Sequence, residues 1–184
     1  GLEVVPLTVT LDGTEYHNYL DGRQIGFHEF YEKLRGGAMG TTSAVSVGAF
    51  QEKMRAILSS GRDVLCLTFS SALSTTYQSA VIAAEDLKTE FPEGKIYVVD
   101  SLNASLGQGL FVWLCAREKA AGKTIEEVRD YAQAIRPKVK AWFTVDDLDH
   151  LKRGGRISAA TAMFGSMLSI KPVMHVDETG HLVA

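Results

Sequence analysis

Cysteine, proline and histidine are scarce in this chain of 184 residues, which contains two cysteines, four prolines and five histidines. Cys66 and Cys115 lie in apolar runs far apart in the sequence, which favours two small buried side chains in a reducing cytoplasm over a disulfide or a metal site. His150, His175 and His181 lack the spacing of metal ligands, which argues against a zinc site. We therefore expect neither a metal nor a cofactor.

Long apolar runs and an excess of positive charge are also absent. No stretch approaches the roughly 20 apolar residues of a membrane span, and a net charge of -3 argues against a surface for nucleic acid or anionic lipid. The chain opens with Gly1-Leu2-Glu3, which does not resemble a secretory signal, so we expect a cytoplasmic protein. With 46% hydrophobic and 22% charged residues, the composition is that of a soluble globular protein.

Two common catalytic signatures are missing. The chain contains no G-x-S-x-G nucleophile elbow and no G-x-x-x-x-G-K-[ST] phosphate loop. Gly107-x-Gly109 is a lone glycine pair, which the close packing of a helix start explains better than a dinucleotide site. We expect a binding protein without catalytic residues of its own.

Apolar strands alternate with amphipathic helices over residues 1–139. An antiparallel hairpin is expected around Asp12-Gly13, then a short helix over residues 27–35 and a hydroxyl-rich loop at Gly40–Ser46. Beyond this loop the pattern predicts strands over residues 64–69 and 95–99, and helices over residues 47–58, 76–91, 106–121 and 124–136. This alternation predicts an α/β domain whose parallel sheet has helices on both faces.

From residue 140 onward the pattern changes. The expected elements are a strand over residues 141–145, a short helix over 147–151, a small-residue helix over 158–168, a strand over 170–176 and a hairpin that stops at Ala184. A sheet that stops one strand into a hairpin is incomplete. We therefore predict that residues 140–184 begin a second, α+β domain.

A turn rich in hydroxyl groups follows the first buried strand, at Phe69–Ala80. The unpaired amides of a helix start and the hydroxyls of Ser70, Ser71 and Ser74 together favour capture of a small anion. Thr42-Ser43 and Asp100-Ser101 could meet these serines at one sheet edge, where ligands of parallel sheets bind. Neutral donors suit a carboxylate that must be held and released.

Two other interpretations of this turn stay open. The serines could serve only as helix caps, as serines commonly do. The same edge could also bind a phosphorylated small molecule, as an enzyme or a sensor, because helix N-termini bind phosphate as readily as carboxylate.

The basic turn Lys152–Arg156 is a further candidate, and two interpretations of it are equally open. Its charges could interact with the C-terminus of the preceding helix. Alternatively, Arg156 beside two glycines could reach an anionic ligand or a negatively charged partner surface.

In combination, these segments resemble the DegV family of bacterial fatty-acid-binding proteins, whose FakB members serve fatty acid kinase. The resemblance covers nearly all of the chain. It rests on five segments, which are Val4–Val9, Thr42–Ser46, Ser70–Ala80, Asp100-Ser101 with Gly107-Gln108-Gly109, and Leu151–Ser158.

The resemblance implies a two-domain α/β protein that encloses one long-chain fatty acid (C14 to C18) and presents it to a separate fatty acid kinase for acyl-phosphate formation. By this resemblance, hydroxyls hold the carboxylate, and Arg156 with Arg153 lies near the head group or the kinase-facing surface. The hydroxyl-bearing residues are Thr42, Ser43, Ser70, Ser71 and Ser74. The resemblance also implies that the first domain, residues 1–139, lacks the family's usual first strand. From the net charge and the short apolar runs, we expect neither nucleic-acid binding nor stable insertion in a membrane.

Overall fold

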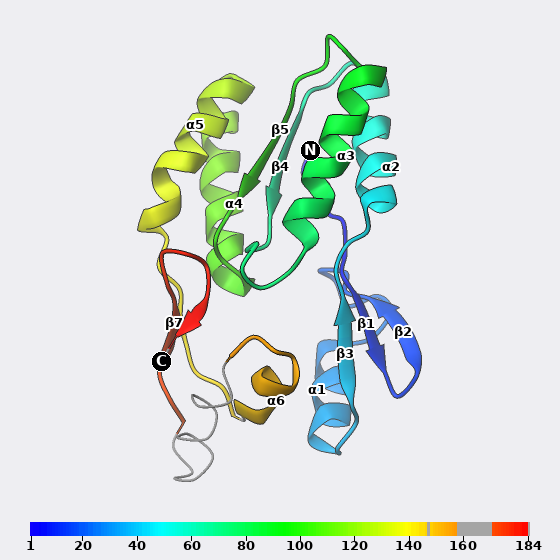
Figure 1. Cartoon of the computed structure of the whole chain (residues 1–184), viewed down its shortest axis with the longest axis vertical. Coiled ribbons are helices and arrows are strands. Elements are labelled where there is room, and N and C mark those ends of the chain that lie inside the picture. Colours follow the sequence, from blue (N-terminus) through cyan, green and yellow to red (C-terminus); the bar gives the residue numbers. More distant parts are fainter. Residues whose placement is uncertain (147, 158–170, 184) are drawn as a thin grey trace.

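The computed structural model describes residues 1–146, 148–157 and 171–183. Two parallel strands form the centre of its upper half, with helices on both sides (Figure 1). The strands are β4 (Val64–Thr68) and β5 (Ile96–Asp100). One face is covered by α2 (Val47–Ser59) and α3 (Thr76–Glu90), the other by α4 (Ser105–Ala120) and α5 (Ile125–Ile135).

Both faces of this sheet are buried, which explains why its strands are almost continuously apolar. Val64 and Ile96 contribute to a core shared with α2 and α3. On the other face, Val99 packs with Phe111 of α4 and Val128 of α5. The carboxyl ends of both strands point toward the lower half of the molecule, so the turns that follow them lie at mid-height (Figure 1).

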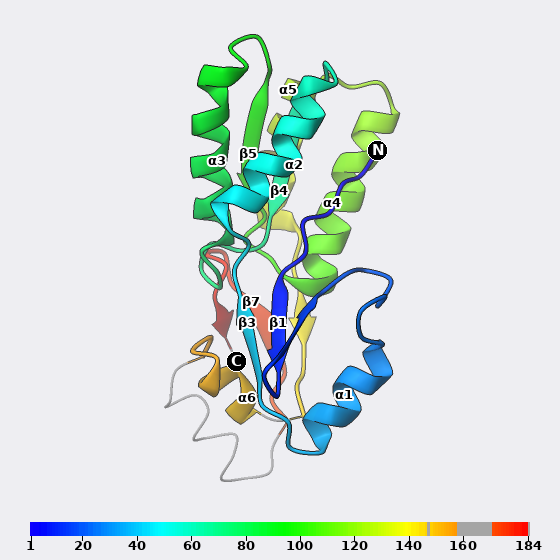
Figure 2. The same ribbon diagram turned by 90° about the vertical axis from the view of Figure 1, so that its right-hand side faces the viewer.

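The lower half holds two small antiparallel sheets. The first has the strand order β2-β1-β3 and is formed by β1 (Thr8–Leu11), β2 (Thr14–His17) and β3 (Gly40–Ser43), with α1 (Phe27–Arg35) beside it. Asp12 and Gly13 join β1 to β2, both with positive φ, as a tight hairpin turn requires. Figure 2 shows β1 and β3 running side by side below α2.

The second small sheet has the order β6-β7-β8 and follows a 3-10 turn at Arg136–Lys138. Its strands are β6 (Trp142–Phe143), β7 (Met174–Val176) and β8 (Leu182–Val183). The short helix α6 (Leu148–Arg153) packs on it through Leu148, which shares an apolar cluster with Met174.

The predicted fold class is confirmed: a parallel sheet has helices on both faces, and antiparallel sheets accompany it. One local prediction is wrong. Residues 40–43 form strand β3, paired with β1, and not a loop. The helix expected over residues 158–168 lies outside the described residues, and the domain boundary near residue 139 stays a prediction. Within the described part of the chain, no helix combines the length and apolar character needed to cross a bilayer.

Candidate functional site

The turn between β4 and α3, residues 69–75, lies where the upper and lower halves of the molecule meet (Figures 1 and 2). Four segments that are distant in sequence bond to this turn or to the first residue of α3. They are the end of β5, the β7–β8 hairpin, the segment after β3, and the basic turn after α6. Asp100-Ser101 was expected at this edge from the sequence, and so was Thr42-Ser43, which directly precedes the segment that bonds through Val45.

Asp100 joins the turn to the end of β5. The backbone N–H of Ser71 lies 3.3 Å from each carboxylate oxygen of Asp100, and the N–H of Leu102 lies 2.9 Å from Oδ1. Leu102 has a φ of 47°, in the left-handed region that a leucine seldom adopts. The carboxylate therefore stabilises a strained turn at β5 and fixes Ser71 at the same time.

Ser70 is buried completely and bonds within the protein. Its hydroxyl donates to the carbonyl oxygen of Gly180 at 2.9 Å and accepts from the N–H of Ala72 at 3.3 Å. Ser70 was predicted to hold a carboxylate. Because its proton is already donated and no surface of it is exposed, the structure gives it the role of fixing the β7–β8 hairpin against the turn.

Ser71 is better placed for a ligand. It is half-buried, and its hydroxyl makes no hydrogen bond to any of the residues that the structure describes. The hydroxyl of Ser74, also half-buried, lies 2.8 Å from that of Thr76 and accepts the N–H of Thr76 at 3.2 Å. Thr75, the N-cap residue of α3, makes no capping bond through its side chain.

Thr42 and Ser43 are exposed and lie at the end of β3, two to three residues before Val45, which bonds to the start of α3. The hydroxyl of Thr76 accepts the N–H of Val45 at 3.4 Å, which joins the segment after β3 to the start of α3. Thr42 pairs with Val9 of β1. The structure thus brings the predicted hydroxyl segments to the same part of the molecule.

Arg156 comes from the basic turn and bonds to the serine turn directly. Its Nε donates to the carbonyl oxygen of Leu73 at 3.1 Å, and Nη1 donates to that of Gly154. A guanidinium has five N–H donors, and three of those of Arg156 make no hydrogen bond to a described residue. Arg153, at the end of α6, is exposed, and no hydrogen bond or ion pair joins it to another described residue.

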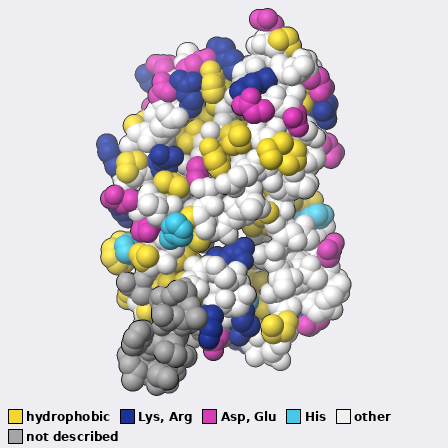
Figure 3. Space-filling model, viewed as in Figure 1, with side chains coloured by type: hydrophobic (Ala, Val, Ile, Leu, Met, Phe, Trp, Pro, Cys, Tyr) yellow, Lys and Arg dark blue, Asp and Glu magenta, His cyan; other side chains and the backbone are white. Residues whose placement is uncertain are grey.

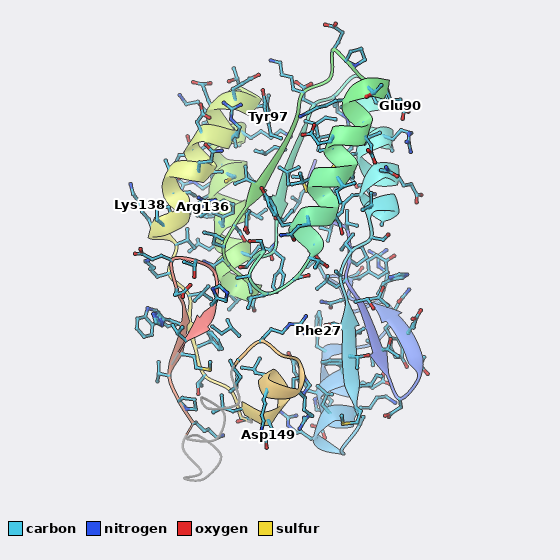
Figure 4. All side chains as sticks on the ribbon, viewed as in Figure 1. Phe27, Glu90, Tyr97, Arg136, Lys138 and Asp149 are labelled. Atoms are coloured by element: carbon cyan, nitrogen blue, oxygen red, sulfur yellow. The ribbon has the colours of Figure 1, made fainter. Side chains whose placement is uncertain are left out.

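The surface around this junction is hollowed. Figure 3 shows a depression between the upper and lower halves, with Lys or Arg side chains in it. A pocket of about 260 Å³ includes Thr42 in its lining and is otherwise mostly apolar, with Tyr19, Phe27, Phe30 and Tyr31 around it. Figure 4 labels Phe27 beside α1, on this side of the molecule.

A larger groove lies elsewhere, along the outer edge of β4. Its volume is about 670 Å³, and its lining includes Met54, Leu65 and Cys115. None of the predicted site residues contributes to it. We therefore place the candidate site at the β4–α3 turn, where the polar side chains converge.

The described residues of the site lack the pairings that common catalytic mechanisms use. No histidine in the described part of the chain bonds to a serine of the turn, so a serine–histidine pair is absent there. Burial raises the pKa of the Cys66 thiol to about 12 and that of Cys115 to about 11, which leaves almost no thiolate at neutral pH. Among the described residues, no group of three or more His, Cys, Asp or Glu side chains could hold a metal ion.

Comparison with known proteins decides the family. The sequence model of the DegV family, described as uncharacterised proteins of that family, matches residues 1–184. The chain belongs to the DegV family. This confirms the resemblance drawn from the five sequence segments.

Among DegV relatives, a DegV domain-containing protein of Clostridium perfringens is 44% identical over 176 residues, covering 96% of this chain and 60% of the relative. Two solved structures are also similar. A stearic acid-binding protein of Eubacterium ventriosum has a TM-score of 0.86 at 29% identity and covers 97% of this chain and 60% of its own. A DegV family protein of Thermus thermophilus, described by its fatty acid binding, has a TM-score of 0.82 at 36% identity, with 98% and 61% covered. The chain thus spans about 60% of the length of these DegV proteins.

Sequence reasoning missed the contact between Ser70 and Gly180. Asp177–Gly180 has the composition of a hairpin turn, and nothing in such a turn indicates a bond to a serine 110 positions away. It also missed that Asp100 accepts the Ser71 amide. The sequence shows an aspartate at the end of β5. Which N–H group its carboxylate accepts depends on how the turns after β4 and β5 fold together.

Proposed function

We propose that this DegV protein binds a long-chain fatty acid and holds its carboxylate at the β4–α3 turn with the hydroxyls of Ser71, Ser74, Thr42 and Ser43. Arg156 supplies the positive charge nearby. The observation that carries the proposal is the meeting of three segments at one half-buried turn: Arg156 donates to Leu73 at 3.1 Å, and the N–H of Val45, just after β3, donates to the Thr76 hydroxyl at 3.4 Å. Ser70 is left out of the ligand set because its hydroxyl is bonded to Gly180.

The site is suited to a carboxylate joined to an apolar chain. Hydroxyl donors are neutral, so they bind an anion without burying countercharges. The pocket beside Thr42 offers apolar and aromatic surface, which an acyl chain needs. The solved relatives from Eubacterium ventriosum and Thermus thermophilus bind stearic acid and a fatty acid, respectively, which supports the same ligand class here.

We also propose that the bound fatty acid is presented to a separate fatty acid kinase, because the described residues of the site include no serine–histidine pair. Arg153, exposed at the end of α6, is available to such a partner. A phosphorylated small molecule is less suited to this edge. The Ser71 amide that would bind phosphate already donates to Asp100.

The proposal is tested by extracting lipid from the purified protein and by titrating it with oleate. We expect a C14 to C18 fatty acid in the extract, and saturable binding of oleate after the lipid is removed. A thermal-shift screen provides the comparison, in which fatty acids raise the melting temperature and sugar phosphates or nucleotides do not. Lipid-free protein that is stabilised only by the phosphorylated compounds would reverse the assignment.

A further inference from the structure

Asp100 is a carboxylate buried directly behind the candidate site. Only 7% of its surface is exposed, and both of its oxygens lie 3.3 Å from the N–H of Ser71, the residue whose hydroxyl faces the ligand in the proposed function. Both oxygens accept backbone N–H groups, and neither is needed as a donor to any described residue, which is the arrangement that suits a carboxylate anion. A negative charge at Asp100 would therefore lie next to Ser71, one of the residues proposed to bind the anion.

The charge of Asp100 has no cation bonded to it in the described part of the chain. None of the ion pairs there includes Asp100. Arg136, labelled near the end of α5 in Figure 4, approaches this residue, but its Nη1 donates to the backbone carbonyl of Asp100 at 3.5 Å. Two backbone amides, those of Ser71 and Leu102, are what satisfies the carboxylate.

From this placement we infer that Asp100 determines which ligand charge the site accepts, favouring a singly charged head group over a doubly charged one. The inference rests on the proposed function. Repulsion between like charges grows in proportion to the charge of the ligand, and burial weakens its screening by solvent and salt. A carboxylate ligand experiences this repulsion once and a phosphate dianion twice, so the hydroxyls and Arg156 retain the first more readily than the second.

The inference also has a consequence for turnover. If the kinase transfers a phosphoryl group from a nucleoside triphosphate to the bound carboxylate and releases the diphosphate, the acyl phosphate carries more negative charge beside Asp100 and is held less tightly than the fatty acid. Asp100 thereby determines ligand specificity by electrostatic repulsion, without contacting the ligand directly. Its second effect, positioning Ser71, comes from the hydrogen bonds and not from the charge.

Replacing Asp100 with asparagine separates the effect of its charge from the effect of its hydrogen bonds to Ser71 and Leu102. Oδ1 of Asp100 accepts from both Ser71 and Leu102, so an asparagine with its carbonyl oxygen in that place keeps these two bonds, loses only the second Ser71 contact at Oδ2, and removes the charge. Asp63→Asn is the matched control. Asp63 also accepts a backbone N–H, from Lys95 at 2.9 Å, but it is exposed and precedes β4 at the opposite end of the sheet.

The experiment measures the affinity of each protein for three ligands with the same tail: hexadecanol, hexadecanoate and hexadecyl phosphate at pH 8. In the wild type, we expect hexadecanoate to bind about tenfold more tightly than hexadecyl phosphate. In Asp100→Asn, we expect a gain on the order of tenfold for hexadecanoate and a hundredfold for hexadecyl phosphate, with hexadecanol unchanged. Asp63→Asn leaves all three affinities as they are, and melting curves report whether each variant folds.

The outcomes distinguish this inference from the function on which it rests. If the wild type binds none of the three ligands, the proposed function fails, and charge selection fails with it. If the wild type binds hexadecanoate but prefers the phosphate, or if Asp100→Asn shifts all three ligands equally, charge selection alone is wrong and Asp100 has only a positioning role. A wild-type preference for the phosphate contradicts charge selection even if the Asn variant does not fold.

Discussion

Replacing Gly180 with alanine is expected to lower the melting temperature by about 6–12 °C and to abolish oleate binding. Gly180 is buried and has a φ of 88°, and a Cβ placed on it would lie 2.2 Å from the Ser70 hydroxyl oxygen and 3.3 Å from Cα of Leu102. The left-handed backbone costs alanine about 1–2 kcal/mol, and forcing an extra carbon into a packed site costs about 1–3 kcal/mol. At roughly 2–4 °C per kcal/mol for a chain of this size, about 3 kcal/mol gives the expected shift.

The matched control is Gly13→Ala in the β1–β2 turn. Gly13 has a similar φ of 80°, but nothing lies within 4 Å of the added Cβ. This variant incurs only the backbone cost, about 1–2 kcal/mol, and should bind oleate as the wild type does. Equal losses in the two variants would show that the Ser70–Gly180 contact contributes nothing, and that the hairpin does not fix the turn.

Replacing Ser71 with alanine, or Thr42 with valine, is expected to weaken oleate binding roughly tenfold or more in each case. A hydrogen bond to a charged group contributes about 1.5–3 kcal/mol, and about 1.4 kcal/mol corresponds to a factor of ten in affinity. The folding stability should hardly change, because neither hydroxyl bonds to another described residue. Isothermal titration with oleate and thermal melting measure the two effects separately.

Ser59→Ala, at the end of α2 and exposed, is the control for these two variants. It removes a hydroxyl far from the β4–α3 turn and should change neither property. A helix cap predicts the opposite pattern for Ser71, namely a loss on the order of 1 kcal/mol in stability with affinity unchanged. That pattern would remove Ser71 from the proposed site.

The regular part of the fold follows from local sequence patterns. The apolar runs predict β4 and β5 because both faces of a parallel sheet are buried, and those strands pack in two separate cores as expected. Thr124 and Glu127 form the capping box that their spacing predicts at the start of α5. These signals are local, and so they can be identified from the sequence alone.

The pairing of β3 is not a local property. Gly40–Ser43 is polar and contains no apolar alternation, yet it forms a strand because β1 offers a free edge with Val9 opposite Thr42. The same holds for the internal contacts of the candidate site. The sequence shows that the turn is rich in hydroxyls. The structure shows that the Ser70 hydroxyl bonds to Gly180, and that the Ser71 hydroxyl bonds to none of the described residues.

The central claim is that the carboxylate of a fatty acid lies at the β4–α3 turn. A crystal structure of the protein with 2-bromohexadecanoate tests it most directly, because the anomalous signal of bromine marks the carbon next to the carboxylate. We predict one bromine peak beside the Ser71 hydroxyl, within reach of Arg156. A peak in the groove along β4, lined by Met54 and Leu65, with no ligand density at the turn, would contradict the claim.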